Sequence, residues 1–208
     1  MKRQEEPEVQ RGAVDVRQLP TTVFGHRDPL WWGTMGFVAI EGTTLFIAVA
    51  SYFYLWRNTG TWPPQHTLRP SLLWPTISLA VLLLSNIPIR FLARAARRLD
   101  AGAVKRWLVV ATVLSFAFLF LRWQDLLSLN VRWDTNAYGS IAWLTVGLHA
   151  TLLVANAGEF AVFTALFHSS RRTERHLGDA VDASVYWHFM TGIWAPLYAV
   201  VYLGPYLI

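Results

Sequence analysis

Five long apolar segments with very few charged residues constrain this chain more than any other feature. A helix needs about 20 consecutive apolar residues to cross the hydrocarbon core of a bilayer. The five segments run over 30–56, 72–92, 107–129, 138–167 and 184–206. Charged residues make up 15% of the 208 residues, against roughly 25% in average soluble chains. We therefore predict an all-α, polytopic membrane protein whose five transmembrane helices form a bundle.

Lys and Arg are distributed unevenly among the segments that flank these spans. If the N-terminus lies inside, 14 of the 18 basic residues fall on the inner side and only Arg57, Arg69, Arg122 and Arg132 on the outer side. Basic residues collect at the cytoplasmic ends of membrane helices. We therefore expect the N-terminus inside and the C-terminus outside, and the net charge of +5 needs no nucleic-acid partner. The polar segment 1–29 is expected to be a solvated, partly disordered tail before the membrane domain, 30–208.

Glu41 is the one carboxylate in the apolar stretch GFVAIEGTTLFIAVASYFYLW, residues 36–56. It follows Trp31 and Trp32 by about ten residues, which at ~1.5 Å per residue places it near the bilayer midplane. A carboxylate exposed to lipid tails at that depth costs several kcal/mol, so we expect Glu41 to face the bundle, neutral or hydrogen-bonded. Two interpretations stay open: a functional group, or a structural hydrogen bond between helices.

The fourth span carries three further polar residues. His149, Asn156 and Glu159 are seven and three positions apart and fall on one side of the helix. A polar seam against another helix is the plain interpretation of this pattern. The more specific interpretation is a proton path, since ionisable groups within membranes often transfer protons.

The fifth span carries two neighbouring stripes. Trp187, Trp194 and Tyr198 form one stripe, and His188, Thr191 and Tyr198 form the other. Aromatic stripes at helical spacing are more often packing surfaces than cofactor sites, so we interpret the first stripe as packing.

The sequence predicts no catalytic, cofactor-binding or metal-binding residue in this chain. There are no cysteines, which excludes thiolate metal sites. Of the six histidines only His149 and His188 lie within spans, and no two share a helix at ligand spacing. The HExxH motif and the nucleotide-binding and nucleophile motifs of soluble enzymes are also missing.

The fifth span, VYWHFMTGIWAPLYAVVYLGP, resembles the last helix of subunit III of the haem–copper oxidases. The family pattern there is Tyr-Trp-His-Phe-Val-Asp-x-x-Trp followed by a Tyr-rich stretch. The matching residues are Tyr186, Trp187, His188, Phe189, Trp194 and Tyr198. Earlier in the chain, Glu41, Phe46, Tyr52 and Arg57 resemble a family helix with Ser-Glu-x-x-x-Phe, and AWLTVGLHATLL resembles Leu-Thr-Gly-x-His-Gly-x-His with His149 as the first histidine.

The resemblance covers about residues 30–205 and corresponds to the short, five-helix form of subunit III. The chain departs from the family at several polar positions. Leu152 stands where the second histidine is expected, and Thr191 replaces an acidic residue. Arg122 and Asp125 occupy positions where the family usually has Gln and Glu. The chain is therefore identified as a divergent member.

The resemblance implies an accessory subunit of a terminal oxidase in a bacterial-type cytoplasmic membrane. Such a subunit has no redox centre, packs beside subunit I and subunit II, binds phospholipid, and supports stability and the access of oxygen or protons. Haem and copper belong to the partner subunits, and both cytochrome c and quinol stay open as electron donors. Two alternatives remain: the related accessory protein of nitric oxide reductases, and a small transporter with Glu41 on its pathway, although no paired repeats support the transporter.

Overall fold

The computed structural model describes residues 24–169 and 175–207, and helices are the only regular elements in them. A 3₁₀ turn, η2 (Gly25–Arg27), precedes α1 (Pro29–Asn58). Next come α2 (Leu73–Arg97), α3 (Ala101–Leu127) and α4 (Ala137–His168). Helix α5 (Arg175–Tyr198) continues into a π-helix, η3 (Ala199–Leu203), and a last turn, α6 (Gly204–Leu207). The all-α prediction is confirmed for these residues. Of the polar tail predicted over 1–29, residues 1–23 lie outside the described part of the chain.

Four helices, α1 to α4, are long and apolar enough to cross a membrane. They correspond to the first four predicted spans. The helices extend beyond the apolar segments, since α2 reaches Arg97 and α3 already begins at Ala101. The fifth predicted span, 184–206, falls on α5, η3 and α6 together and stays a prediction, as does the orientation of the termini.

Polar side chains fix where three of these helices begin. Asp28 accepts a hydrogen bond from the backbone N–H of Leu30 at 3.0 Å, just before α1. Asp100 accepts one from the N–H of Ala103 at 2.9 Å, and Asn136 one from the N–H of Gly139 at 2.8 Å. Such N-caps satisfy backbone donors that have no partner within the helix. Helices α1, α3 and α4 therefore have defined first turns.

Two prolines lie inside helices without ending them. Helix α2 continues past Pro88, and α5 continues past Pro196. Proline removes one backbone hydrogen bond, and packed membrane helices tolerate this loss because neighbouring groups satisfy the freed carbonyl. Just beyond Pro196 the α-helix changes to the π-helix η3.

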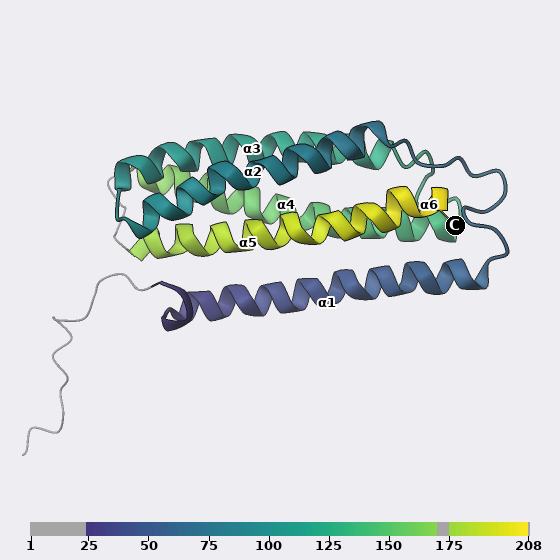
Figure 1. Ribbon diagram of the computed structural model, residues 1–208, viewed down its shortest axis with the longest axis horizontal. Coiled ribbons are helices and arrows are strands. Elements are labelled where there is room, and N and C mark those ends of the chain that lie inside the picture. Colours follow the sequence, from purple (N-terminus) through teal and green to yellow (C-terminus); the bar gives the residue numbers. More distant parts are fainter. Residues whose placement is uncertain (1–23, 170–174, 208) are drawn as a thin grey trace, which may run out of the picture.

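The helices run side by side along the long axis of the molecule (Figure 1). Helix α2 packs against α3 and α5, α3 packs against α4, and α4 packs against α5. These four helices form a bundle, and α1 is added to it along α4 and α5. In Figure 1, α5 lies between α1 and α2, and α1 contacts both α4 and α5.

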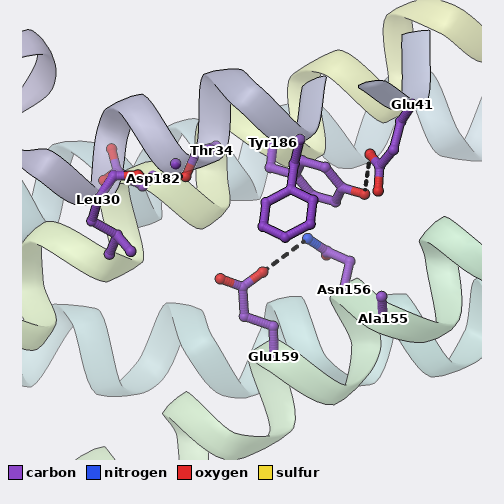
Figure 2. Close-up of a pocket in the computed structure, with 10 residues that line it drawn as sticks. Leu30, Thr34, Glu41, Ala155, Asn156, Glu159, Asp182 and Tyr186 are labelled. Carbon is purple, nitrogen blue, oxygen red and sulfur yellow. Dashed lines mark hydrogen bonds between the residues drawn. The ribbon is translucent and has the colours of Figure 1, made fainter. Parts of the chain in front are cut away.

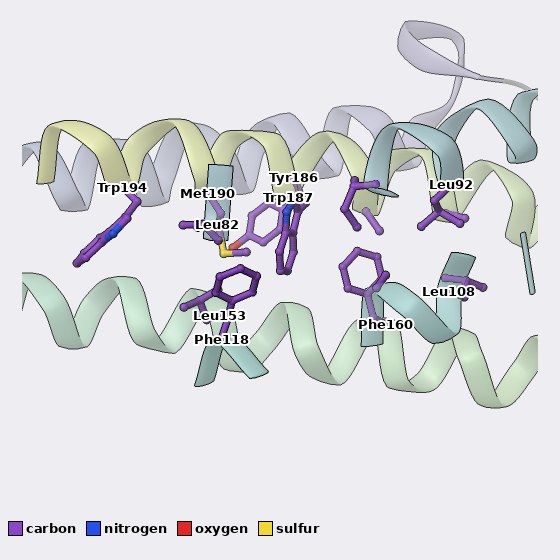
Figure 3. Close-up of a cluster of buried hydrophobic side chains, with 14 of the residues drawn as sticks. Leu82, Leu92, Leu108, Phe118, Leu153, Phe160, Tyr186, Trp187, Met190 and Trp194 are labelled. Atoms are coloured by element: carbon purple, nitrogen blue, oxygen red, sulfur yellow. The ribbon is translucent and has the colours of Figure 1, made fainter. Parts of the chain in front are cut away.

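The centre of the bundle is aromatic (Figure 3). Trp187 on α5 is fully buried, with its ring 5.7 Å from that of Phe118 on α3 and 5.7 Å from that of Phe160 on α4. Its Nε1–H donates to Ser85 Oγ on α2 at 2.9 Å. One side chain thus contacts three helices. Close packing and interhelical hydrogen bonds of this kind hold helices together where lipid replaces water.

Candidate functional site

Glu41 contacts the last helix of the bundle. Its Oε2 accepts a hydrogen bond from the hydroxyl of Tyr186 on α5 at 2.6 Å. A Cβ added at the neighbouring Gly42 would lie 3.7 Å from the ring of Phe189, so α1 and α5 are in close contact here. The carboxylate is therefore hydrogen-bonded across a helix interface near the middle of α1. A hydrogen bond to a charged acceptor is typically among the stronger side-chain contacts.

A cavity of about 300 Å³ lies beside Glu41, between α1, α4 and α5 (Figure 2). Asn156 and Glu159 reach it from α4, and Asn156 Nδ2 donates to Glu159 Oε2 at 3.5 Å. Asp182 reaches it from α5, near Leu30 and Thr34. The apolar part of the lining comes from α1 and α4. The complete lining is Leu30, Gly33, Thr34, Phe37, Glu41, Ala155, Asn156, Glu159, Asp182 and Tyr186.

Glu41 also lines a second, smaller cavity of about 180 Å³. The opposite wall of this cavity belongs to α4 and includes Leu152. The family histidine expected at Leu152 would thus stand near Glu41, but leucine has no hydrogen-bonding group to offer. In this chain the carboxylate hydrogen-bonds Tyr186 instead.

A second polar network lies wholly inside the bundle. Arg122 Nη1 on α3 donates to Asp125 Oδ2 at 2.9 Å, and Arg122 Nη2 lies 3.2 Å from His149 Nδ1 on α4. His149 Nε2 lies 3.1 Å from the carbonyl oxygen of Met190 on α5. A carbonyl oxygen can only accept, so Nε2 carries the hydrogen and Nδ1 accepts from the guanidinium. His149 therefore links α3 to α5 as a neutral ring.

The charged pair in this network is closed off from its surroundings. Arg122 is 2% exposed and Asp125 is 0% exposed. The guanidinium carbon lies 3.5 Å from the centre of the Trp194 ring, a cation–π contact, and the Tyr202 hydroxyl donates to the backbone carbonyl of Asp125 at 2.8 Å. The sequence-based count placed Arg122 on the outer side, whereas the structure places it inside the bundle. The i,i+3 spacing of Arg122 and Asp125 was the signal for this pair.

The structure places some of the predicted polar residues at the cavity beside Glu41 and others in the network around Arg122. Glu41, Asn156, Glu159 and Tyr186 share the larger cavity, and His149 and Trp194 belong to the network of Arg122. Thr191 donates to the carbonyl of Trp187, and the Tyr198 hydroxyl lies 2.6 Å from Thr76 Oγ1 on α2. His188 Nδ1 donates to the carbonyl of Ser184 at 2.5 Å, outside both networks. Sequence reasoning missed Asp182 and Ser85.

Metal-binding geometry is not found in the part of the chain that the structure describes. No group of three or more His, Asp or Glu side chains there is arranged to hold a metal ion.

Comparison with known proteins gives one consistent result. The family model for cytochrome c oxidase subunit III matches residues 24–206. A cytochrome c oxidase subunit 3 from Synechocystis sp. is 25% identical over 185 residues, covering 86% of this chain and 77% of the relative. The cytochrome c oxidase subunit 3 from Corynebacterium diphtheriae is 29% identical over 178 residues, covering 82% of this chain and 85% of the relative. The cytochrome c oxidase subunit 3 from Thermostichus vulcanus is 25% identical over 182 residues, covering 86% of this chain and 89% of the relative. The chain belongs to the cytochrome c oxidase subunit III family.

Proposed function

We propose that this chain is the accessory subunit III of a haem–copper terminal oxidase and carries no redox centre itself. The observation that carries the proposal is the family match, which spans residues 24–206 and reaches every described helix. Relatives named as cytochrome c oxidase subunit 3 are matched along 77–89% of their own lengths, so the similarity extends over most of each relative.

The partners are subunit I and subunit II, in a bacterial-type cytoplasmic membrane. Haem and copper belong to those subunits, where oxygen is reduced. This chain contributes packing surface and stability, and phospholipid binds against its helices. The N-terminus lies inside and the C-terminus outside, following the distribution of Lys and Arg.

The two polar networks support the stabilising role. Glu41 and Tyr186 join α1 to α5, while Arg122 and His149 join α3, α4 and α5. Each network satisfies polar groups that lipid could not satisfy. The cavities on either side of Glu41 are the places in the described structure where lipid, oxygen or protons would approach this carboxylate.

Co-purification tests the proposal directly. A tagged chain extracted in mild detergent should bring down a haem-containing, multi-span subunit that reduces oxygen. Recovery as a lone, haem-free protein would overturn the subunit proposal. A partner that reduces nitric oxide instead would assign the chain to the related reductases.

The orientation has its own test. Single cysteines introduced at 98 and 132 should be labelled by an impermeant reagent only from the inner and the outer face, respectively. Labelling of position 98 from the outer face would reverse the proposed topology.

Glu41→Gln separates the two interpretations of this residue. Glutamine keeps an acceptor for the Tyr186 hydroxyl but removes the negative charge and the exchangeable carboxyl proton. If Glu41 acts in turnover, the assembled complex should show a changed rate or a shorter active lifetime. Unchanged kinetics in a fully assembled complex would leave only the structural hydrogen bond.

A further inference from the structure

The connection between α1 and α2 lies at the same end of the bundle as α6 (Figure 1) and forms a cavity of about 430 Å³. The described residues of the cavity wall all belong to the stretch 56–69. They include one permanent cation, Arg69, and no Asp or Glu. Since a cleft lined by charge of one sign attracts ions of the opposite sign, this wall favours an anionic ligand.

Contacts with the rest of the chain hold this connection in place. Asn136 Nδ2, at the start of α4, donates to Thr67 Oγ1 at 2.8 Å. Asn130 Nδ2 donates to the backbone carbonyl of Arg69 at 2.9 Å. Trp62 is buried in the aromatic cluster between α1 and α4. The cavity therefore has its shape before any ligand binds, and a preformed site loses less conformational entropy on binding.

The backbone of the connection adopts an unusual conformation at the cavity wall. His66 has a φ of +66°, in the left-handed region. Residues other than glycine rarely adopt this conformation. It persists only where the surrounding structure enforces it, and such positions cluster at ligand-binding and functional sites. The turn at His66 brings the side chains of both Gln65 and His66 to the cavity.

The hydrogen-bond donors of this wall are not used within the described part of the chain. The amide of Gln65 and the ring of His66 have no hydrogen-bond partner there. The guanidinium of Arg69 forms no ion pair with any described carboxylate, whereas that of Arg132 is paired with Asp134. The cavity thus combines a full positive charge with donors that a ligand can satisfy.

Arg69 is nevertheless fixed in position. Its guanidinium carbon lies 5.3 Å from the centre of the Tyr206 ring, a cation–π contact. The Tyr206 hydroxyl donates to the backbone carbonyl of Pro70 at 2.8 Å, which fixes the ring in turn. A contact over the ring leaves the N–H groups at the edge of the guanidinium available. This planar edge matches a carboxylate through two parallel hydrogen bonds.

We infer that this cavity binds a carboxylate carried by an extended segment of a partner protein, with Arg69 as the pairing cation. A single carboxylate fills only a small part of about 430 Å³, so the cavity also holds the residues on either side of it. The N–H groups of Gly60 and Thr61 make no backbone hydrogen bond within the described chain and can pair with an extended main chain. Pro63 and Pro64 provide an apolar wall. The inference rests on the proposed function, which supplies the partner subunit.

Peptide selection tests the inference without a partner. The purified chain is immobilised in mild detergent and exposed to equal amounts of two acetylated and amidated pentapeptide libraries, X-X-Glu-X-X and X-X-Gln-X-X, in which X is never acidic. Retained peptides are measured by mass spectrometry. Glutamate peptides should be enriched about tenfold over glutamine peptides, as expected for charge-assisted hydrogen bonds. Equal retention overturns the inference. Displacement by free N-acetylglutamate at the same concentration overturns the need for a protein segment.

Variants of equal net charge locate the site. Arg69→Gln should abolish the preference for glutamate, whereas Arg57→Gln, in the last turn of α1 and outside the cavity wall, should keep it. Equal effects of the two variants would reduce the preference to the overall charge of +5 and overturn this location. If Arg69→Gln fails to fold, Arg69→Lys keeps the charge without the planar fork and should still lower the enrichment.

The complex identifies the protein that carries the carboxylate. A carbodiimide joins a carboxylate to an amine in contact with it but not to a guanidinium, and the chain has only two lysines, Lys2 and Lys105. In the co-purified complex, Arg69→Lys should form a cross-link to an Asp or Glu of a partner subunit, whereas Arg57→Lys should not. A complex without a cross-link at position 69 overturns the inference. The peptide libraries need no partner, so they can fail while co-purification succeeds, and the reverse.

Discussion

The buried pair of Arg122 and Asp125 gives the sharpest quantitative prediction. We consider Arg122→Met, Asp125→Leu and the double variant, which replace the charges by apolar groups. Removing one member of a buried ion pair typically costs about 3–5 kcal/mol, because the other charge stays behind without compensation. Each single variant should therefore lower the free energy of unfolding by about that amount.

The double variant should be less damaged than the sum of the two single variants. It leaves no isolated charge, and its losses are the donor to His149 Nδ1 and the contact with Trp194. An unsatisfied buried acceptor costs about 1–3 kcal/mol and a desolvated cation–π contact contributes about 2 kcal/mol. The coupling energy between the two sites should therefore be about 3 kcal/mol or more.

The assay is unfolding in mixed micelles at increasing proportions of a denaturing detergent, followed by tryptophan fluorescence and by helix content. Trp194 lies against Arg122 and contributes to the fluorescence that the 11 tryptophans share, while helix content follows the bundle as a whole. If the effects of the two single substitutions simply add, within about 0.5 kcal/mol, the pair is not a mutually compensated charge and the reasoning fails. The same conclusion would follow if Arg122→Met alone were as stable as the wild type.

Three further predictions use the same unfolding measurement. Tyr186→Phe should cost about 1.5–3 kcal/mol, because it removes the hydroxyl that donates to Glu41 at 2.6 Å; an unchanged value would mean that Glu41 finds another donor. Gly139→Ala should cost about 1–3 kcal/mol, because a Cβ there would lie 2.3 Å from the carbonyl oxygen of Arg132. Gly147→Ala on the same helix meets nothing within 4 Å and should gain about 0.5–1 kcal/mol; equal effects at both glycines would contradict this account. Ser85→Ala should cost about 1–3 kcal/mol by leaving the Nε1–H of Trp187 buried without its acceptor, and Ser71→Ala, near the start of α2, serves as the control.

Apolar length and charge were enough to predict the helical fold and the first four spans. The ends of the helices were harder to predict. A predicted span ends where the sequence becomes polar, whereas the helix itself continues into the polar residues. Helix α3 begins at Ala101, six residues before the predicted span, because Asp100 caps it and Lys105 and Arg106 are good helix formers.

The pairing of polar groups was only partly predictable. Spacing could have revealed Arg122 with Asp125, which are one helical turn apart. Nothing local links Glu41 to Tyr186, which are 145 positions apart and meet only because α1 packs against α5. The same holds for the division of the α4 residues, since His149 contacts α3 and α5 while Asn156 and Glu159 reach the cavity beside α1. Helical periodicity predicts which side chains share one side of a helix, but not which other helix packs against that side.

The contact between α1 and α5 also has a consequence for biosynthesis. Helix α1 is made before α2, α3 and α4, yet Tyr186, which hydrogen-bonds its carboxylate, is made only after them. Until Tyr186 emerges, Glu41 must stay protonated, hydrated or held by the insertion machinery, since membrane helices form before they pack. Nascent chains arrested at residue 168 should therefore keep α1 beside the translocon, whereas full-length chains released from the ribosome should not.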